Sequence, residues 1–160
     1  MGSPEQISQV EDIRYVHGAM PVNFAYTVGV AGERFFREIM ENGRFLGTRC
    51  QHCQYTYLPP RLYCERCFAS LNDQWVEVSS RGSVEAFTIA HLDLDGQPLA
   101  EPQLLALIRL EGADGLLVHR LGGVRAEDVD IGLSVVAVFR PRRQRKGSIL
   151  DIQHFKPATS

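Results

Sequence analysis

The chain has 160 residues, of which 44% are hydrophobic and 22% charged, and its net charge at pH 7 is −2. This composition is that of a globular protein with one compact domain, or with a small module attached to a domain, and it argues against global disorder. No apolar run approaches the roughly 20 residues that span a bilayer, and the polar start of the chain lacks the apolar core of a secretory signal. We therefore expect a cytoplasmic protein without a membrane partner, whose acidic charge gives no overall attraction to nucleic acid.

The N-terminal part of the chain contains the best helix pattern. The alternation of Phe24, Tyr26 and Val28 first indicates a short extended segment. A helix is then predicted over residues 32–42 (GERFFREIMEN), and Gly43 can adopt the positive φ that ends it. Two interpretations of its apolar face stay open, since it can pack on the next module or dock on another subunit. The residues at helix-face spacing are Phe35, Phe36, Ile39 and Met40.

All four cysteines lie within residues 50–67 (CQHCQYTYLPPRLYCERC), as two C-x-x-C pairs separated by ten residues. Each pair can turn two thiolates inward from a tight loop, and two such loops complete the tetrahedron that Zn²⁺ prefers in structural sites. Four thiolates leave no open position for water or substrate, so we expect a structural Zn²⁺ that does not catalyse. The predicted metal ligands are Cys50, Cys53, Cys64 and Cys67.

Three alternatives stay open for these cysteines. A C-x-x-C pair can be a redox dithiol, four cysteines can form two disulfides, and the same thiolates can bind iron. His52 can replace a cysteine ligand, but with four thiolates present we expect a solvated side chain. Residues 44–49 and 55–58 are predicted strands and Pro59-Pro60-Arg61 is a stiff connection, so the segment is predicted to be a zinc ribbon.

From residue 73 onward the pattern is that of a β-domain. A turn or bulge is predicted at residues 80–82, a loop around Gly96 and Pro98, and a short connection or single helical turn at residues 125–132. The number of strands and their spacing favour a small antiparallel barrel of the OB type. The predicted strands cover residues 74–79, 83–94, 103–110, 116–121, 133–140 and 149–156.

No nucleophile–base–orienter set can be assembled from the polar residues, and no phosphate-binding or dinucleotide-binding glycine motif is present, so we predict no catalytic residue. The histidines that fall in predicted strands are expected to be packing or rim residues. The basic loop at residues 140–146 (RPRRQRK) has two interpretations of equal weight, a phosphate-binding site or a solvated hairpin tip. The histidines are His17, His52, His91, His119 and His154.

Several motifs follow one another in a specific order: RFFREIMENG, C-x-x-C, PPR, C-x-x-C and WVEVSSRGSVEAFT, then LLALIRLEG, EDVDIGLSVVAVF and DIQHFKP. In this order, over residues 24–157, the chain resembles the DUF35 family, in which a rubredoxin-like zinc ribbon precedes an OB-fold domain. The resemblance implies a mainly β protein with an N-terminal segment and helix in residues 1–43. The ribbon would cover residues 44–72, and an antiparallel five-stranded OB-fold barrel would cover residues 73–160.

Members of the DUF35 family accompany thiolases, thiolase-like condensing enzymes or acyl-CoA hydratases, and some are non-catalytic subunits of these enzymes. The resemblance therefore implies an accessory subunit that forms a hetero-oligomer with a thiolase or related acyl-CoA enzyme. It would support acyl-CoA binding in fatty, sterol or aromatic acid metabolism. The segment FAYTVGVAGERFF is similar to the thiolase-partner branch. The expected contact regions are the N-terminal segment, the helix around Phe35 and Phe36, and the ribbon.

Two alternative functions stay open. One is a stand-alone acyl-CoA-binding OB-fold protein. The other is a protein that binds single-stranded nucleic acid, against which the acidic charge and the scarcity of aromatic residues in the predicted barrel argue. In one respect the chain departs from the family, whose cysteine loops often carry glycine after the second cysteine of each pair. Gln54 and Phe68 occupy these positions here, so we predict a strained, positive-φ backbone at both.

Overall fold

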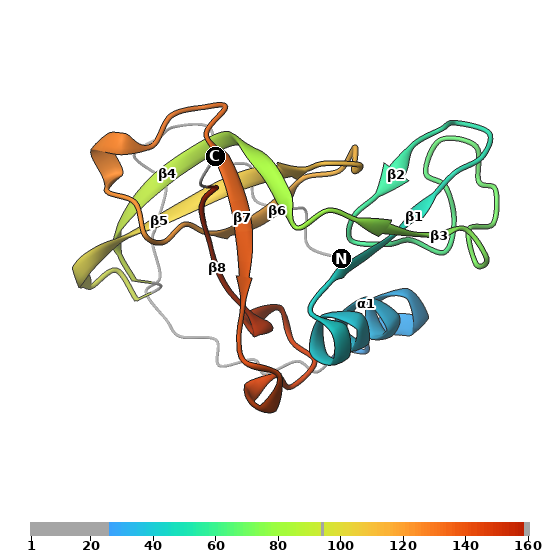
Figure 1. The fold of residues 1–160 in the computed structure, drawn as a ribbon, viewed down its shortest axis with the longest axis horizontal. Coiled ribbons are helices and arrows are strands. Elements are labelled where there is room, and N and C mark those ends of the chain that lie inside the picture. The colour runs from blue at the N-terminus through green and yellow to red at the C-terminus, as the bar shows by residue number, and fades with distance from the viewer. Residues whose placement is uncertain (1–25, 94, 159–160) are drawn as a thin grey trace, which may run out of the picture.

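The computed structural model describes residues 26–93 and 95–158, which fold into a helix, a small three-stranded sheet and a five-stranded sheet (Figure 1). The helix, α1, spans Gly29–Asn42. The small sheet has the order β2-β1-β3, with strands β1 Phe45–Arg49, β2 Thr56–Tyr57 and β3 Trp75–Val78. Within the described ranges, no helix is long and apolar enough to cross a membrane.

The larger sheet has the strand order β6-β5-β4-β7-β8, and each neighbouring pair is antiparallel. A parallel bridge between Leu121 and Phe155 brings its two outer strands together, so the sheet curves into a barrel. The predicted five-stranded antiparallel barrel is confirmed. Its strands are β4 Arg81–Leu92, β5 Pro98–Leu110, β6 Leu117–Arg120, β7 Ser134–Phe139 and β8 Ile152–Pro157. The described residues also form the short 3-10 turns η2 Ala126–Asp128, η3 Arg142–Gln144 and η4 Ile149–Asp151.

The helix, the small sheet and the barrel share one apolar core. Phe45 of β1 has no exposed surface, and its ring stacks on Phe35 of α1 and on Phe155 of β8, with centroids 6.3 Å apart in both pairs. The interpretation of the helix face as a packing surface is therefore confirmed for Phe35. Phe35 is only 1% exposed and is occupied by the core, whereas the neighbouring Phe36 is half-buried. A partner contact through this helix stays a prediction, and it would have to use residues other than Phe35.

Helix α1 begins three residues earlier than predicted. Gly29 has a φ of 67°, which lets the chain turn into the helix before the amphipathic pattern starts. Val28, the residue before it, has φ −75° and ψ −6°, so the predicted extended segment is wrong at this position. Phe24 of the same prediction lies outside the described residues. At the other end, Gly43 has a φ of 63° and ends the helix as predicted.

Several predicted boundaries in the barrel are wrong. The turn or bulge expected at residues 80–82 is restricted to a bend at Ser80, because β4 begins at Arg81 and Gly82 pairs with Leu110 on one side and with Val135 on the other. A Cβ at Gly82 would lie 2.2 Å from the Arg109 carbonyl oxygen, so glycine is needed for this close approach. The loop around residues 96–98 is shorter than predicted, because β5 begins at its end.

The last predicted strand, residues 149–156, begins too early. Ser148 and Asp151 form a capping box that holds the three residues of η4 in a helical turn, and β8 starts only after it. The single helical turn predicted within residues 125–132 is present as η2.

Candidate metal centre

The four cysteines lie in two loops of the same construction. In the first loop the Cys50 N–H donates to the Tyr55 carbonyl at 2.9 Å, and in the second the Cys64 N–H donates to the Ala69 carbonyl at the same distance. Each loop therefore closes over the same number of residues, and each turns its cysteine pair toward the other loop.

A positive φ follows the second cysteine of each pair. Gln54 has a φ of 55° and Phe68 a φ of 58°, and no other described residue except glycine has a positive φ. The predicted strain is confirmed at both positions. Residues with a Cβ rarely adopt this backbone conformation, so it costs free energy that the rest of each loop must offset.

The sulfur atoms of Cys50, Cys53, Cys64 and Cys67 all lie within 4.8 Å of one another. The Cys50 and Cys67 sulfurs are 3.6 Å apart, and those of Cys53 and Cys64 are 3.8 Å apart. Four sulfurs placed about 2.3 Å from one ion in a tetrahedron are about 3.8 Å apart, whereas a disulfide bond measures about 2.05 Å. All four cysteines are free. The donor set therefore fits a single tetrahedral ion that prefers sulfur, with every position of the tetrahedron filled.

The surroundings shift the pKa values of two of these thiols in opposite directions. The Tyr57 hydroxyl accepts the Glu65 N–H at 3.1 Å and directs its own proton to the Cys64 sulfur, 3.3 Å away. This contact lowers the pKa of Cys64 to about 6. The hydrogen bond with the Cys67 sulfur, followed by burial, raises the pKa of Cys53 to about 12. A cation among the sulfurs would favour the thiolate at all four positions.

The turn between β5 and β6 holds the first cysteine loop against the barrel. The Asp114 carboxylate accepts the Thr56 N–H at 2.8 Å, and the Asp114 N–H donates to the Thr56 carbonyl at 3.0 Å. The Tyr55 hydroxyl donates to the Asp114 carbonyl at 3.2 Å. A Cβ at Gly115 would lie 2.8 Å from the Leu58 carbonyl oxygen, so the two backbones are in direct contact. These contacts fix the ribbon to the barrel.

The connection between the cysteine loops is bound to β1. The fully buried Thr48 hydroxyl accepts the Arg61 N–H and donates to the Arg61 carbonyl, both at 3.0 Å. Of the Pro59-Pro60-Arg61 segment, Pro60 is buried while Pro59 and Arg61 are exposed. Only part of this segment is therefore available to a partner.

The second cysteine loop displays two aromatic side chains. Phe68 is 79% exposed and Tyr63 is 60% exposed. By contrast, Tyr55 of the first loop is covered by the guanidinium of Arg66, 4.3 Å from its ring centroid. His52 is exposed, as predicted. A large apolar side chain that is both exposed and held in a strained backbone indicates a contact surface.

Two cations of the basic loop bind backbone carbonyls. The Arg145 Nη1 donates to the Ile39 and Met40 carbonyls at 3.3 and 3.5 Å, at the C-terminus of α1, where a cation is favoured. The Arg140 Nε donates to the Leu150 carbonyl at 2.8 Å. The sequence did not predict these structural roles. The phosphate-binding interpretation still applies to the exposed cations of this loop whose side chains have neither an ion pair nor a hydrogen bond to the described residues. These are Arg142, Arg143 and Lys146.

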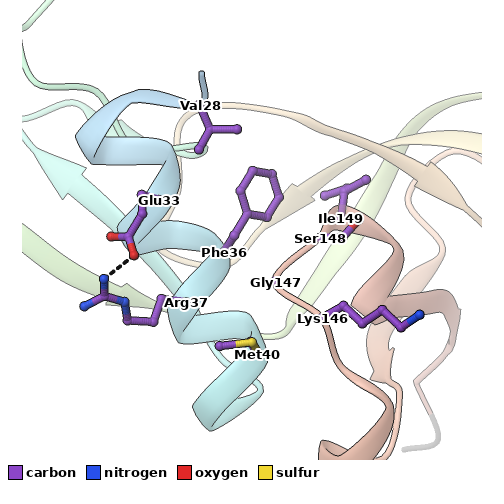
Figure 2. A pocket seen from close by; sticks show the side chains of 9 residues that line it. All are labelled: Val28, Glu33, Phe36, Arg37, Met40, Lys146, Gly147, Ser148 and Ile149. Atoms are coloured by element: carbon purple, nitrogen blue, oxygen red, sulfur yellow. Dashed lines mark hydrogen bonds and ion pairs between the residues drawn. The ribbon is translucent and has the colours of Figure 1, made fainter. Parts of the chain in front are cut away.

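A groove of about 410 Å³ runs between α1 and the loop before η4 (Figure 2). Figure 2 shows the Phe36 ring projecting from the helix toward Ile149, and the Lys146 ammonium pointing away from the helix. The polar pair Glu33 and Arg37 lies along the helix beside the groove. The floor is therefore apolar, and is formed by Val28, Phe36, Met40 and Ile149.

Asp151 fixes the far wall of this groove and was missed by the sequence analysis. It is 2% exposed, and its carboxylate accepts the backbone N–H groups of Lys146, Gly147 and Ser148 at 2.7 to 3.2 Å. The pattern S-x-x-D of a capping box was the available signal, but it lay inside a segment predicted as a strand. The groove is thus bordered by a loop that the chain itself holds in place.

Two histidines of the barrel strands, His119 and His154, pack against the fold, whereas His91 on β4 is exposed. His119 is 8% exposed, its ring meets Phe155 edge-on at 5.7 Å, and its Nε2 lies 3.4 Å from the Ile149 carbonyl oxygen. Its Nδ1 has no hydrogen-bond partner in the described part of the chain, and burial lowers the pKa of the ring. A Cβ at Gly122 would lie only 2.7 Å from a carbon atom of the His154 ring, so this ring packs directly against the Gly122 backbone. His17 lies outside the described residues.

Comparison with known protein families finds separate matches for the ribbon and for the barrel. The rubredoxin-like zinc ribbon domain of ChsH2 matches residues 37–72, and the C-terminal OB-fold domain of ChsH2 matches residues 75–140. The DUF35 domain-containing scaffold protein of Methanocaldococcus jannaschii is 30% identical over 107 residues, which are 67% of this chain and 75% of that protein. The protein of the same description from Pyrococcus furiosus is 30% identical over 126 residues, 78% of this chain and 90% of that protein.

Solved structures show the same fold. A DUF35-family protein of unknown function from Sulfolobus solfataricus has a TM-score of 0.62 at 27% identity, covering 81% of this chain and 87% of that chain. A chain of the structure described as the Ltp2-ChsH2(DUF35) aldolase has a TM-score of 0.60 at 23% identity. The match covers 84% of this chain and 100% of that chain. A cysteine ribbon joined to an OB-fold barrel is therefore the class of this protein. The chain belongs to the DUF35 family.

Proposed function

We propose that Cys50, Cys53, Cys64 and Cys67 bind one Zn²⁺ whose role is structural. The sulfur separations of 3.6 and 3.8 Å support this, because they match the edges of a zinc–thiolate tetrahedron. The ribbon also has little core of its own beyond Tyr57, Leu71 and the cysteines, so an ion at its centre would supply much of its stability. With four protein ligands the ion has no position left for substrate.

The function that follows is that of a scaffold. The chain is a non-catalytic accessory subunit that assembles with a thiolase or related acyl-CoA enzyme, and the reacting groups belong to that enzyme. The curated relatives are named scaffold proteins, and a chain of the same fold belongs to a structure described as an aldolase with two named components. The observation that carries the proposal is the exposed Phe68 on a loop whose metal centre is closed to substrate.

Purification and reconstitution test this proposal. The tagged chain is purified from its native cells, and we expect a thiolase-like enzyme to be retained. That enzyme is then produced alone and together with this chain, and its activity and thermal stability should be higher in the complex. If no thiolase-like enzyme is retained, or if its activity is the same with and without the chain, the scaffold function is wrong.

The groove beside Phe36 favours a second candidate function, the binding of acyl-CoA by this chain itself. Its apolar floor suits an acyl chain, and the exposed Arg142 and Arg143 lie on the neighbouring segment. Calorimetry with decanoyl-CoA, CoA and decanoate tests it. Met40→Glu places a charge in the groove and should abolish decanoyl-CoA binding, whereas Glu41→Gln on the exposed helix surface should not. No heat with decanoyl-CoA at high micromolar concentration contradicts this function.

A further inference from the structure

The β4–β5 hairpin continues past the barrel as a two-stranded arm, formed by residues 89–92 and 98–103. β4 pairs with β7 only through residues 81–83, and β5 pairs with β6 only through residues 105–108. Beyond these points the two strands pair only with each other. The end of the hairpin lies at the opposite end of the molecule from the ribbon (Figure 1). A two-stranded hairpin is marginally stable by itself in water, so a covering surface would stabilise the arm.

The arm and its turn are apolar and acidic. Leu92 is 56% exposed. Asp95 and Glu101 are exposed and have no ion-pair partner within the described ranges. Asp93 has a structural role, because its carboxylate accepts the N–H groups of Asp95 and Gln97 at 2.9 and 2.8 Å and so shapes the turn. The arm and its turn therefore present an exposed apolar side chain and two exposed carboxylates that have no ion pair among the described residues.

A complementary surface lies on the outside of the barrel. Ala86, Leu107 and Val118 face one another across β4, β5 and β6, and Leu105 follows in the next row. We call these four residues the outer face. Val118 is 62% exposed and Leu107 is 36% exposed. The solvent side of an antiparallel sheet is usually polar, so an apolar row across three strands indicates a contact surface.

Two arginines lie at one end of the outer face. A hollow of about 290 Å³ over the outer face shares Leu105 and Val118 with a second hollow of about 210 Å³, which Arg120 and Arg140 line. Neither arginine has an ion-pair partner in the described part of the chain. Pockets that enclose small ligands usually measure about 300–1,000 Å³, so these hollows suit side chains of a protein better.

We propose that two copies of this chain pair through these surfaces, with the arm of each copy lying on the outer face of the other. Leu92 then contacts the apolar row, and Asp95 and Glu101 approach Arg120 and Arg140. The arm continues the two strands that carry Ala86, Leu105 and Leu107 of the outer face. One twofold axis therefore makes both contacts at once and closes the dimer. The pairing goes beyond the scaffold function and does not depend on it.

Analytical ultracentrifugation of the full chain tests the pairing. Over about 1 to 100 µM, a range that covers weak protein interfaces, the mass should rise from the monomer's 17.9 kDa toward twice that value. Two charge-reversed variants are compared, Arg120→Glu with Arg140→Glu, and Asp95→Arg with Glu101→Arg. Each alone should raise the dissociation constant at least about tenfold. An equimolar mixture of the two should dimerise again, because each arm then meets an outer face of opposite charge.

Lys156→Glu is the matched control, since Lys156 is exposed on β8 and away from the arm. It should dimerise like the wild type. Far-ultraviolet circular dichroism and metal content identify any variant that fails to fold, and such a variant is replaced by the single reversals Arg120→Glu and Glu101→Arg. A wild-type monomer throughout the range, reversed variants that dimerise normally, or a mixture that stays monomeric would each overturn the pairing.

Discussion

The ring of Phe45 stacks on the ring of Phe155 with their planes only 5° apart, although the two residues belong to different sheets. Phe45 begins the strand that leads to Cys50, and Phe155 lies in the last strand of the barrel. Phe35 of α1 also stacks on the Phe45 ring, so the helix, the small sheet and the barrel meet at this one side chain. The position of the cysteine cluster therefore depends on the core of the barrel.

Phe45→Ala should lower the free energy of unfolding by about 3–5 kcal/mol, because it leaves a cavity where three parts of the fold meet. Urea unfolding followed by both tryptophan fluorescence and circular dichroism measures the loss. Phe87→Ala is the control, since Phe87 is 37% exposed and should cost about 1 kcal/mol or less. Equal losses for the two variants would contradict the central role of Phe45.

Cys64→Ser should release the metal and unfold the ribbon, while Ser70→Ala in the same loop should keep both. Mass spectrometry of the purified protein should find one zinc per chain in the wild type and almost none in Cys64→Ser. Acidification should also release the metal, because protons compete for the thiolates. Iron in place of zinc would correct the ion assigned, and a metal-free folded protein with two disulfides would overturn the site.

The local features of the metal centre could be predicted from the sequence. The two C-x-x-C pairs gave the cysteine cluster, and the positions of Gln54 and Phe68 gave the positive φ, because both depend on neighbours in the chain. The contact between Thr56 and Asp114 could not be predicted in the same way. These residues are 58 positions apart, and no local pattern marks a hydrogen bond across that separation.

The barrel shows the same limit. The residue pattern predicted the five strands of the barrel, but it also placed residues 74–79 in this domain, although β3 pairs with β1 of the small sheet. Turn-forming residues misplaced several strand ends. Gly82 looked like a turn because its real partners, two neighbouring strands, are distant in sequence. Pro98 looked like part of a loop because proline is rare inside sheets, yet it begins a strand that has only one neighbour there. Tertiary pairing decided both positions.

Phe68→Gly separates a contact role of the second cysteine loop from a structural one. Because the φ at this position is 58°, glycine fits the backbone without strain, and the stability should stay within about 1 kcal/mol of the wild type. Removal of an exposed aromatic anchor should nevertheless weaken binding to the partner enzyme by about tenfold or more. Titration of the enzyme with each variant, followed by fluorescence anisotropy, measures this.

Gln54→Gly is the matched control, since Gln54 has nearly the same φ on the first cysteine loop but no aromatic side chain. It should bind the partner like the wild type. If both glycine variants lose binding equally, the effect comes from the loop backbone and the contact role of Phe68 is wrong.

His119 should make the stability of the fold depend on pH. Burial lowers the pKa of its ring below the ordinary value of about 6.5, and the nearby charges of Arg120 and His154 act in the same direction. Between the lowered and the ordinary pKa the unfolded chain binds a proton that the folded chain excludes. The free energy of unfolding should therefore fall as the pH drops below about 6.5, by up to about 1.4 kcal/mol per pH unit.

In His119→Gln this contribution should disappear, whereas His91→Gln, at an exposed position, should keep it. Urea unfolding at a series of pH values compares the three proteins, and all of them retain the same cysteine cluster, so metal release affects each equally. Identical pH profiles for the wild type and His119→Gln would show that the ring is protonated in the folded state as easily as in the unfolded one.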